Sequence, residues 1–154
     1  DGDDVDAKGK VTLAAPFDKP YDFAVKKDSR TFPDMLTPQG LAEIKTYADG
    51  IGPWKPYLAS AAQVIGPDGK PKDLNGDGKI TDADRVVIPP TDVIRNAHAA
   101  GLFVHAYTFR SEAPGLVSDY KGDPKAEYKR FFELGVDGLF SDFPDTAVAA
   151  RAGK

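Results

Sequence analysis

The chain has 154 residues and a formal net charge of -4, and no run of Lys or Arg is long enough to form a basic face. This excludes a nucleic-acid-binding protein, because phosphates would have no positive surface to bind. There is no cysteine, which excludes disulfides, a thiol nucleophile and a zinc ribbon. The longest apolar runs are under ten residues, so no membrane span is expected, and any secretion signal is expected to lie outside this chain.

The first third of the chain contains few regular signals. Residues 1–10 are rich in aspartate and are expected to be a solvated segment. Residues 11–15 form a short apolar run of strand length, which predicts the first strand. Residues 17–33 mix proline, charged and aromatic residues without a helical or strand period, which predicts a loop packed by its rings.

A clear helix start follows at Thr37. Threonine is a good N-cap, and Pro38 takes the first helical position, where its missing N–H costs nothing. Gly50 ends the turn that follows this helix, and Ile51 and Gly52 predict a very short strand. Residues 53–90 are then expected to form a long segment without regular helices or strands, which we call the excursion.

Two helix and strand pairs come after the excursion. Thr91 is the expected cap of a helix that ends at Gly101, and a strand is predicted at residues 102–109. The same order repeats with Asp123 as the cap and a strand at residues 136–141.

A last, alanine-rich helix is expected to begin at Asp145 or Thr146. The resulting alternation of strands and helices predicts an α/β fold with parallel strands joined by right-handed crossovers. Site residues are therefore expected at the C-terminal ends of the strands.

Residues 73–84, which read D-L-N-G-D-G-K-I-T-D-A-D, have the spacing of an EF-hand-like calcium loop. The expected ligands are the side chains of Asp73, Asn75, Asp77, Thr81 and Asp84 and the backbone carbonyl of Lys79. Gly78 stands where the chain must turn, and Ile80 is expected to pack the loop down. Asp84 replaces the usual bidentate Glu, which predicts weaker binding that suits a calcium-rich extracellular or periplasmic setting. The alternative is a hydrated Asp/Asn/Gly turn without an ion.

Residues 102–110 alternate in character, as expected for a strand. One face carries the rings of Phe103, His105, Tyr107 and Phe109, and the other carries small residues that suit covering helices. We expect the ring-bearing face to point inward. His105 is interpreted as an imidazole satisfied by a backbone group rather than a catalytic base, and His98 as a partly exposed helix residue.

Three further residues follow predicted strands at the end where active-site groups belong. Trp54 and Lys55 come just after the short strand, and an aromatic beside a lysine suits a phosphate-bearing or polar ligand. Asp142 follows the last strand, where it is equally consistent with a site residue and with a strand-to-helix turn.

Three stretches give the chain a close resemblance to the C-terminal half of the glycerophosphodiester phosphodiesterase family, in its secreted or periplasmic branch. They are Y-A-D-G-I-G-P-W-K (residues 47–55), G-L-F-V-H-A-Y-T-F-R (residues 101–110) and G-V-D-G-L-F-S-D-F-P-D (residues 135–145), with T-P-Q-G-L at the helix start. The resemblance implies a (β/α)8 TIM barrel that hydrolyses glycerophosphodiesters to an alcohol and glycerol 3-phosphate with a divalent metal. The strands here would be barrel strands five to eight.

The family's catalytic residues have no counterpart in this sequence. Its His-Arg pair, its Glu-x-Asp metal pair, its second catalytic His and its further metal-binding Glu are all absent, so the resemblance implies no catalytic residue in this chain. It implies a pocket wall instead, in which Trp54, Lys55, Tyr107 and Asp142 would contact the substrate. The calcium loop would be an insertion within residues 53–90, between barrel strand six and the following helix.

Residues 1–154 are therefore interpreted as the C-terminal half of a phosphodiesterase TIM barrel, which supplies pocket wall and a structural calcium site. The expected partners are the N-terminal half of the same barrel, from the same precursor or a separate chain, and a small glycerophosphodiester. That half would carry the catalytic Ca²⁺ or Mg²⁺, and the expected location is periplasmic or secreted. Two alternatives remain: a non-enzymatic calcium-dependent binding module, although residues 1–9 do not form the second loop that dockerin modules need, and a degenerate barrel kept as an interaction surface.

Overall fold

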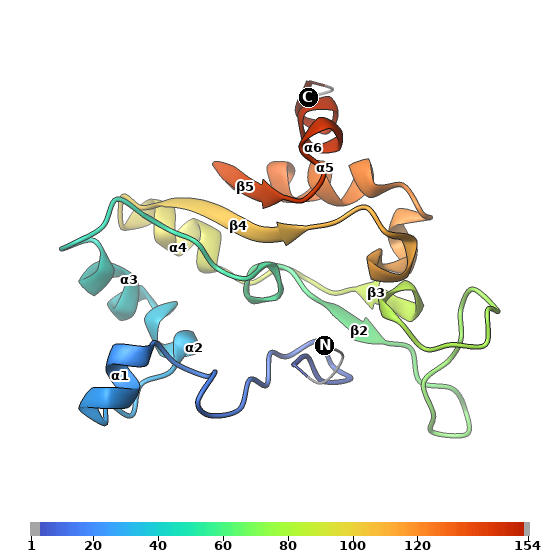
Figure 1. Ribbon diagram of the computed structural model, residues 1–154, viewed down its shortest axis with the longest axis horizontal. Coiled ribbons are helices and arrows are strands. Elements are labelled where there is room, and N and C mark those ends of the chain that lie inside the picture. The colour runs from blue at the N-terminus through green and yellow to red at the C-terminus, as the bar shows by residue number, and fades with distance from the viewer. Residues whose placement is uncertain (1–3, 153–154) are drawn as a thin grey trace.

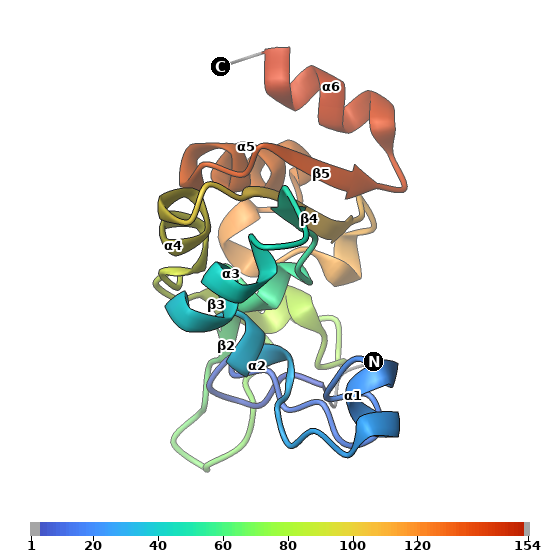
Figure 2. The same ribbon diagram turned by 90° about the vertical axis from the view of Figure 1, so that its left-hand side faces the viewer.

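A computed structural model describes residues 4–152, and its centre is a parallel sheet with strand order β1-β4-β5. The strands are β1 (Gly50–Ile51), β4 (Phe103–Phe109) and β5 (Gly138–Ser141). Helices α4 (Val93–Ala99), α5 (Pro124–Leu134) and α6 (Pro144–Ala152) accompany this sheet, and α6 and α1 lie at opposite ends of the molecule (Figures 1 and 2). The prediction of an α/β fold with parallel strands is confirmed, whereas three strands rather than four form the sheet.

Capping explains where most of the predicted helices begin. The Thr37 hydroxyl accepts a hydrogen bond from the Gly40 N–H at 3.1 Å at the start of α3 (Pro38–Ile44). The Asp123 carboxylate accepts one from the Lys125 N–H at 2.9 Å before α5, which ends at Gly135 with φ 100°. The start of α4 differs from the prediction, because Asp92 is the N-cap and Thr91 instead donates to the Tyr57 carbonyl at 2.7 Å.

Two glycines allow side chains of the central strand to lie across its neighbours. A Cβ on Gly50 would collide with the ring of Phe103, and a Cβ on Gly138 would approach the His105 ring to 2.8 Å. Because both glycines belong to the stretches that carry the family resemblance, these stretches specify close strand contacts as well as a pocket.

The central strand, β4, buries the face that carries small side chains and exposes most of the face that carries aromatic rings. Val104 and Ala106 are fully buried, as the alternation predicts, while Phe103 and Tyr107, which were expected to point inward, are 46% and 42% exposed. The prediction for Phe109 is wrong. The register between β4 and β5 shifts between Ala106 and Phe109, so the Phe109 ring turns to the helix side and stacks on Tyr128 at 5.2 Å.

The predicted strand at residues 11–15 is not formed. The chain instead turns back on itself: the Thr12 N–H donates to the Asp4 carbonyl at 2.8 Å, the Asp6 N–H donates to the Lys10 carbonyl at 2.9 Å, and Val11 makes an isolated bridge with Val5. These local bonds satisfy backbone groups that a sheet would otherwise pair, so the segment does not join β1.

Residues 17–33 are more regular than the predicted loop. They contain α1 (Tyr21–Lys26) and lead into α2 (Phe32–Met35), whose capping box joins Thr31 and Asp34. The prediction that aromatic rings pack this segment is correct only in part, because Phe17 and Tyr21 are 74% and 85% exposed. The aromatic contact that is formed is a cation–π pair, with the Arg30 guanidinium 4.6 Å above the ring of Phe23.

The excursion at residues 53–90 contains short regular elements that the sequence did not predict. They are η1 (Lys55–Tyr57), η2 (Asp82–Asp84) and an antiparallel pair of strands, β2 (Ala61–Gln63) and β3 (Arg85–Val87). Buried Arg85 anchors this pair by donating to the carbonyls of Val5, Asp6 and Ala61 at 3.1 Å each. Two more 3-10 turns, η3 (Ala113–Gly115) and η4 (Ser118–Tyr120), lie between β4 and α5.

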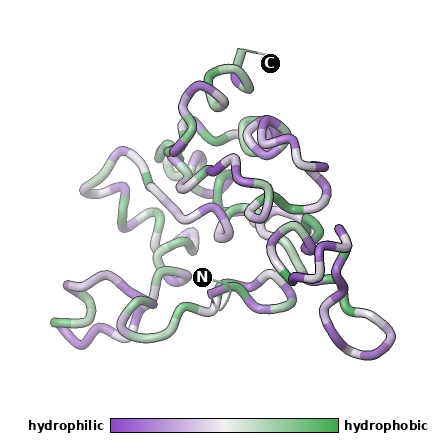
Figure 3. The backbone as a smooth tube through the Cα atoms, turned by 45° about the vertical axis from the view of Figure 1, so that its right-hand side comes forward, coloured by the Kyte–Doolittle hydropathy of each residue, from purple (hydrophilic) through white to green (hydrophobic). Residues whose placement is uncertain are grey.

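The segment between β2 and β3 projects away from the sheet and is largely hydrophilic (Figures 1 and 3). Ile80, expected to pack this segment down, is 47% exposed. Within residues 4–152 no helix has both the length and the apolar character needed to cross a bilayer.

Candidate functional site

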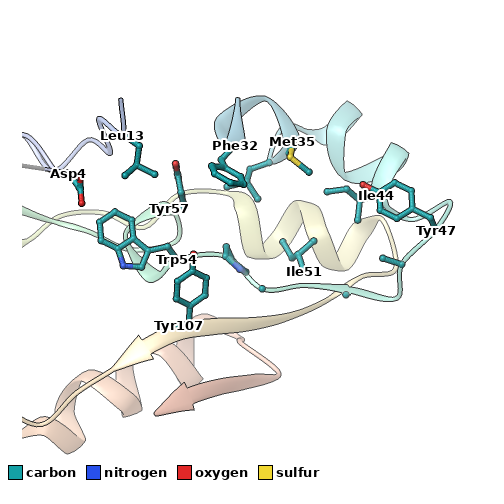
Figure 4. A pocket seen from close by; sticks show the side chains of 15 residues that line it. Asp4, Leu13, Phe32, Met35, Ile44, Tyr47, Ile51, Trp54, Tyr57 and Tyr107 are labelled. Atoms are coloured by element: carbon teal, nitrogen blue, oxygen red, sulfur yellow. The ribbon is translucent and has the colours of Figure 1, made fainter. Parts of the chain in front are cut away.

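A cavity of about 570 Å³ runs along β1 and reaches the C-terminal ends of β1 and β4 (Figure 4). Most of its lining side chains are apolar or aromatic, and they come from the N-terminal segment, α2, α3, β1, η1 and β4. The lining residues are Asp4, Leu13, Phe32, Met35, Leu36, Ile44, Tyr47, Ala48, Gly50, Ile51, Gly52, Pro53, Trp54, Tyr57 and Tyr107.

Trp54 and Tyr107 are brought together at one end of this cavity. The two residues form an isolated parallel bridge that continues the register in which Gly50 faces Phe103, and the Tyr107 N–H donates to the Pro53 carbonyl at 3.2 Å. Tyr57 meets Trp54 edge to face at 6.4 Å. Burial raises the pKa of Tyr57, and the nearby phenol of Tyr107 adds to this shift, so the Tyr57 hydroxyl is a neutral hydrogen-bonding group at neutral pH.

Lys55 points away from the cavity. Its ammonium pairs with Glu127 of α5, with 2.7 Å between Nζ and Oε1, and lies 5.4 Å above the ring of Phe109. The Glu127 side chain is only 4% exposed, and burial raises its pKa even though the Lys55 ammonium opposes that shift. Lys55 therefore sits behind the aromatic wall rather than in it.

Sequence reasoning missed Glu127, although a signal was present. Glu127 precedes Phe131 by four residues, so it lies on the buried stripe of α5. A carboxylate on a buried helical stripe requires a cationic partner. Lys55 is that partner, 72 positions earlier in the chain.

Asp142 lies at the end of β5 and outside the lining of the cavity. Its N–H donates to the Phe109 carbonyl at 3.1 Å, and its carboxylate is 3.7 Å from Nε of Arg110. Arg110 makes its shorter ion pair with Glu112 at 2.7 Å, and this pairing raises the pKa of Arg110. Of the four predicted substrate-contacting residues, Trp54 and Tyr107 line the cavity, whereas Lys55 and Asp142 do not.

The two histidines lie away from this cavity. His98 Nε2 is 2.9 Å from Oδ2 of Asp137, which also accepts the Val104 N–H at 2.8 Å. His105 lies between the rings of Phe103 and Phe140, at 5.0 and 6.4 Å. Neither arrangement places a histidine among the lining residues.

Residues 73–84, the predicted calcium loop, are folded by hydrogen bonds from their own backbone. Asp73 accepts the N–H groups of Gly76 and Gly78, at 2.6 and 2.8 Å, and both glycines have positive φ. Asn75 accepts the Asp77 N–H at 2.9 Å. These bonds fix the positions of the loop's oxygen-bearing side chains relative to the backbone.

Asp84 closes the loop from a buried position, with 2% exposure. It accepts hydrogen bonds from the N–H groups of Leu74, Asn75 and Thr81, at 2.7, 3.4 and 2.9 Å. Burial acts to raise its pKa, but these hydrogen bonds outweigh burial and the pKa is lowered. The carboxylate is therefore ionised at neutral pH.

The oxygen donors of the calcium loop are of the type that Ca²⁺ prefers. Across residues 4–152, however, no group of three or more His, Cys, Asp or Glu side chains is gathered closely enough to hold a metal ion. This part of the chain does not fit the family's catalytic metal.

Comparisons with known proteins agree on one family. The sequence profile of the glycerophosphoryl diester phosphodiesterase family matches residues 28–146. The chain is 33% identical over 116 residues to glycerophosphodiester phosphodiesterase GDPD6 of Arabidopsis thaliana, an alignment that covers 75% of this chain and 26% of the relative. It is 29% identical over 115 residues to a glycerophosphodiester phosphodiesterase of Haemophilus influenzae, covering 74% of this chain and 26% of the relative. The chain thus spans about a quarter of the length of these relatives.

Proposed function

Because the chain belongs to the glycerophosphoryl diester phosphodiesterase family, we propose that it is part of an enzyme that hydrolyses glycerophosphodiesters to an alcohol and glycerol 3-phosphate. Its role is to supply part of the pocket wall. The observation that carries this proposal is the cavity at the C-terminal ends of β1 and β4, where Trp54 and Tyr107 meet. The C-terminal ends of parallel strands are where barrel enzymes place their substrates.

The acid-base histidines and the catalytic Ca²⁺ or Mg²⁺ belong, in this proposal, to a first half of the barrel. Two features support this division. The sequence contains neither a His-Arg nor a Glu-x-Asp pair, and the sheet ends at β1 on one side and at β5 on the other. A further set of parallel strands would pair with both of these edges and close the barrel.

The calcium loop is proposed to bind a structural Ca²⁺ that orders the segment between β2 and β3. The side chains of Asp73, Asn75, Asp77, Thr81 and Asp84 and the carbonyl of Lys79 would hold it, and the ion would have to draw the three carboxylates closer together than they lie in the structure. The support is the ligand spacing and the backbone hydrogen bonds that curl the loop. A site of this kind would suit calcium-rich surroundings, so we propose a periplasmic or secreted location.

A reconstitution assay tests the proposed function. The chain is mixed with a polypeptide that carries the family's His-Arg and Glu-x-Asp pairs, and glycerol 3-phosphate release from glycerophosphocholine is measured with Ca²⁺ or Mg²⁺. Each part by itself should release none, and the mixture should release glycerol 3-phosphate. A mixture that associates but hydrolyses no glycerophosphodiester would disprove the proposed function.

A further inference from the structure

Asn75 is followed by Gly76 in the calcium loop, and both residues are exposed. The segment that carries them projects away from the sheet between β2 and β3 (Figures 1 and 3). A Cβ built on Gly76 would have no neighbour within 4 Å, so its surroundings do not crowd this peptide unit. Glycine also lacks the side chain that would hinder its backbone nitrogen from approaching the amide group of the preceding residue. The Gly76 nitrogen is therefore free to reach the Cγ atom of Asn75.

Each group that such an attack involves has a suitable partner in the structure. The Gly76 N–H donates to Oδ1 of Asp73 at 2.6 Å, so a carboxylate is placed to accept its proton. The Asp77 N–H donates to Oδ1 of Asn75 at 2.9 Å, where it would stabilise the negative charge that develops on that oxygen. Nδ2 of Asn75, the atom that must leave, donates to Oδ2 of Asp77 at 3.3 Å.

We propose that Asn75 undergoes intramolecular deamidation in the folded protein, which makes Asn75–Gly76 a site of covalent modification. The Gly76 nitrogen gives up its proton and bonds to Cγ of Asn75, the bond from Cγ to Nδ2 breaks, and ammonia leaves with that proton. Water then opens the resulting succinimide ring. Cleavage of the new bond yields aspartate, and cleavage of the original peptide bond yields isoaspartate. One water is consumed and one ammonia is released, without oxidation or reduction.

Both products alter the hydrogen bonds of the loop. A carboxylate in place of the Asn75 amide no longer donates to Asp77, and two negative groups then face each other. Isoaspartate also adds a methylene group to the main chain inside the turn that Asp73 closes on Gly76. The reaction should therefore loosen the loop as the protein ages. This inference goes beyond the proposed function, because it requires neither a substrate nor an ion in the loop.

Isotope labelling detects the reaction directly. The folded chain is incubated at neutral pH with a metal chelator in water enriched in oxygen-18, and is then digested in ordinary water. Deamidation before digestion places the heavy oxygen in residue 75, and peptide mass spectrometry with electron-transfer fragmentation distinguishes aspartate from isoaspartate. Both labelled products should form at Asn75. Asn96, the other asparagine in the sequence, lies in α4 before fully buried Ala97 and should form neither.

The same incubation in guanidinium chloride gives the rate for the unfolded chain. Local opening of an exposed loop costs little free energy, so Asn75 in the folded chain should react within about tenfold of the unfolded rate. A folded chain that protects Asn75 more strongly than this would overturn the proposal. So would labelled product at Asn96 at the same rate as at Asn75.

Two glycine variants separate the intramolecular route from direct hydrolysis of the amide by water. Gly76→Ala places a methyl group beside the attacking nitrogen and should slow deamidation by about tenfold or more. Gly69→Ala is the matched control, since Gly69 also has positive φ and open surroundings but lies in the neighbouring turn, and the rate at Asn75 should be unchanged.

A third variant, Asn75→Gln, keeps the amide but lengthens the side chain, so the five-membered ring cannot form and no labelled product should appear at residue 75. This variant leaves the backbone at Gly76 as it is, so it tests the same route if Gly76→Ala reshapes the loop. Deamidation at the wild-type rate in either Gly76→Ala or Asn75→Gln would overturn the proposal.

Discussion

Lys55 and Glu127 show how burial decides the role of a charged residue. A lysine beside Trp54 at a strand end suggests a substrate contact from sequence alone. In the structure the Lys55 side chain is only 22% exposed, and its ammonium pairs with Glu127, whose side chain is 4% exposed. The pair joins η1, which carries Tyr57, to α5, so it holds the aromatic wall against the helix layer.

Lys55→Ala should lower the free energy of unfolding by on the order of 3 kcal/mol at pH 7, because it leaves the Glu127 carboxylate buried without a counter-charge. Chemical denaturation measures this change. The loss should shrink as the pH falls toward the ordinary Glu pKa of 4.5, because the unpaired Glu127 then takes up a proton on folding.

Two comparisons separate this effect from a general loss of charge. Lys45→Ala removes an exposed pair with Asp49 and should change stability little. Lys55→Met combined with Glu127→Leu replaces both charges by apolar groups and should recover most of the loss. Equal destabilisation by Lys45→Ala and Lys55→Ala would contradict the buried-pair argument.

Tyr107 is the residue for which sequence and structure agree most closely on a pocket position. In the reconstituted enzyme, Tyr107→Ala should reduce kcat/KM for glycerophosphodiesters by about tenfold, because it removes one wall of the cavity mouth. Circular dichroism should be unchanged, since the side chain is 42% exposed. Tyr21→Ala, at an 85% exposed position of α1, is the control. Normal kinetics of a folded Tyr107→Ala enzyme would remove Tyr107 from the site.

Asp137 makes part of the stability dependent on pH. Burial acts to raise its pKa, but the Val104 N–H and the His98 imidazole outweigh burial, so folding lowers the pKa below 3.8. A carboxylate with a lowered folded pKa contributes stability above its unfolded pKa, and this contribution is lost as the pH falls through the folded value. Asp137→Asn should therefore lose less stability than the wild type when the pH is lowered below 3.8.

Equilibrium unfolding at a series of acidic pH values measures this difference. His98→Gln is the informative comparison, because it removes one partner and leaves the Val104 N–H in place. It should show an intermediate pH dependence. Identical curves for the wild type and Asp137→Asn would show that this carboxylate does not contribute.

Among the elements, α3 and α5 were predicted well from local signals at their ends, whereas the cap of α4 is Asp92 rather than Thr91. The caps at Thr37 and Asp123 and the stop at Gly135 are satisfied within a few residues of sequence, so the sequence alone places α3 and α5. The β2 and β3 pair was not predicted, because its partners are separated by the calcium loop and its anchor, Arg85, reaches back to Val5 and Asp6.

The errors at residues 11–15 and at Phe109 have the same physical origin. A strand is defined by its neighbour as much as by its own residues. Val11 and Thr12 pair with the preceding segment instead of β1, and Phe109 changes face where the β4 and β5 register shifts. At the candidate site, Trp54 and Tyr107, which the sequence singles out, line the cavity, whereas the pairing of Lys55 with Glu127 depends on a tertiary contact that the sequence does not reveal.

The calcium loop is the element whose function is most readily tested. Asp77→Ala should lower the thermal stability of the chain in millimolar calcium, because binding to the folded state adds stability and this substitution removes one ligand. Asp68→Ala is a matched control, since Asp68 accepts the Lys70 N–H in the neighbouring turn and lies outside the ligand set. Calorimetry at millimolar calcium should detect binding to the wild type and to Asp68→Ala. A heat of binding that Asp77→Ala does not reduce would rule out this site.

At the scale of the whole molecule, the sheet has one face covered by helices and one face that exposes aromatic rings. Val104, Ala106 and the residues around them form the core against α4 and α5. Phe103 and Phe140 are 46% and 57% exposed on the other side, with His105 between their rings. An isolated domain with such a surface gains stability from any partner that covers it.

The last prediction follows from this surface. We expect the chain alone to show no phosphodiesterase activity with any divalent metal and to associate with a first half of the barrel that buries Phe103, Tyr107 and Phe140. At about 25 cal/mol per Å², burial of several hundred Å² is comparable to the roughly 5–15 kcal/mol by which a domain is stable. Sedimentation velocity of the chain with and without that half measures the association.

The Phe140→Glu variant distinguishes association through this aromatic surface from non-specific association. A carboxylate at a 57% exposed position leaves the isolated chain folded, but burying it against a partner costs free energy, so association should weaken by about a hundredfold or more. Ile65→Glu introduces the same charge at a 49% exposed position in the segment between β2 and β3, which projects away from the sheet, and should associate normally. Activity should follow association in both variants. A monomeric preparation of these 154 residues that hydrolyses glycerophosphodiesters without a second polypeptide would refute the division of the barrel.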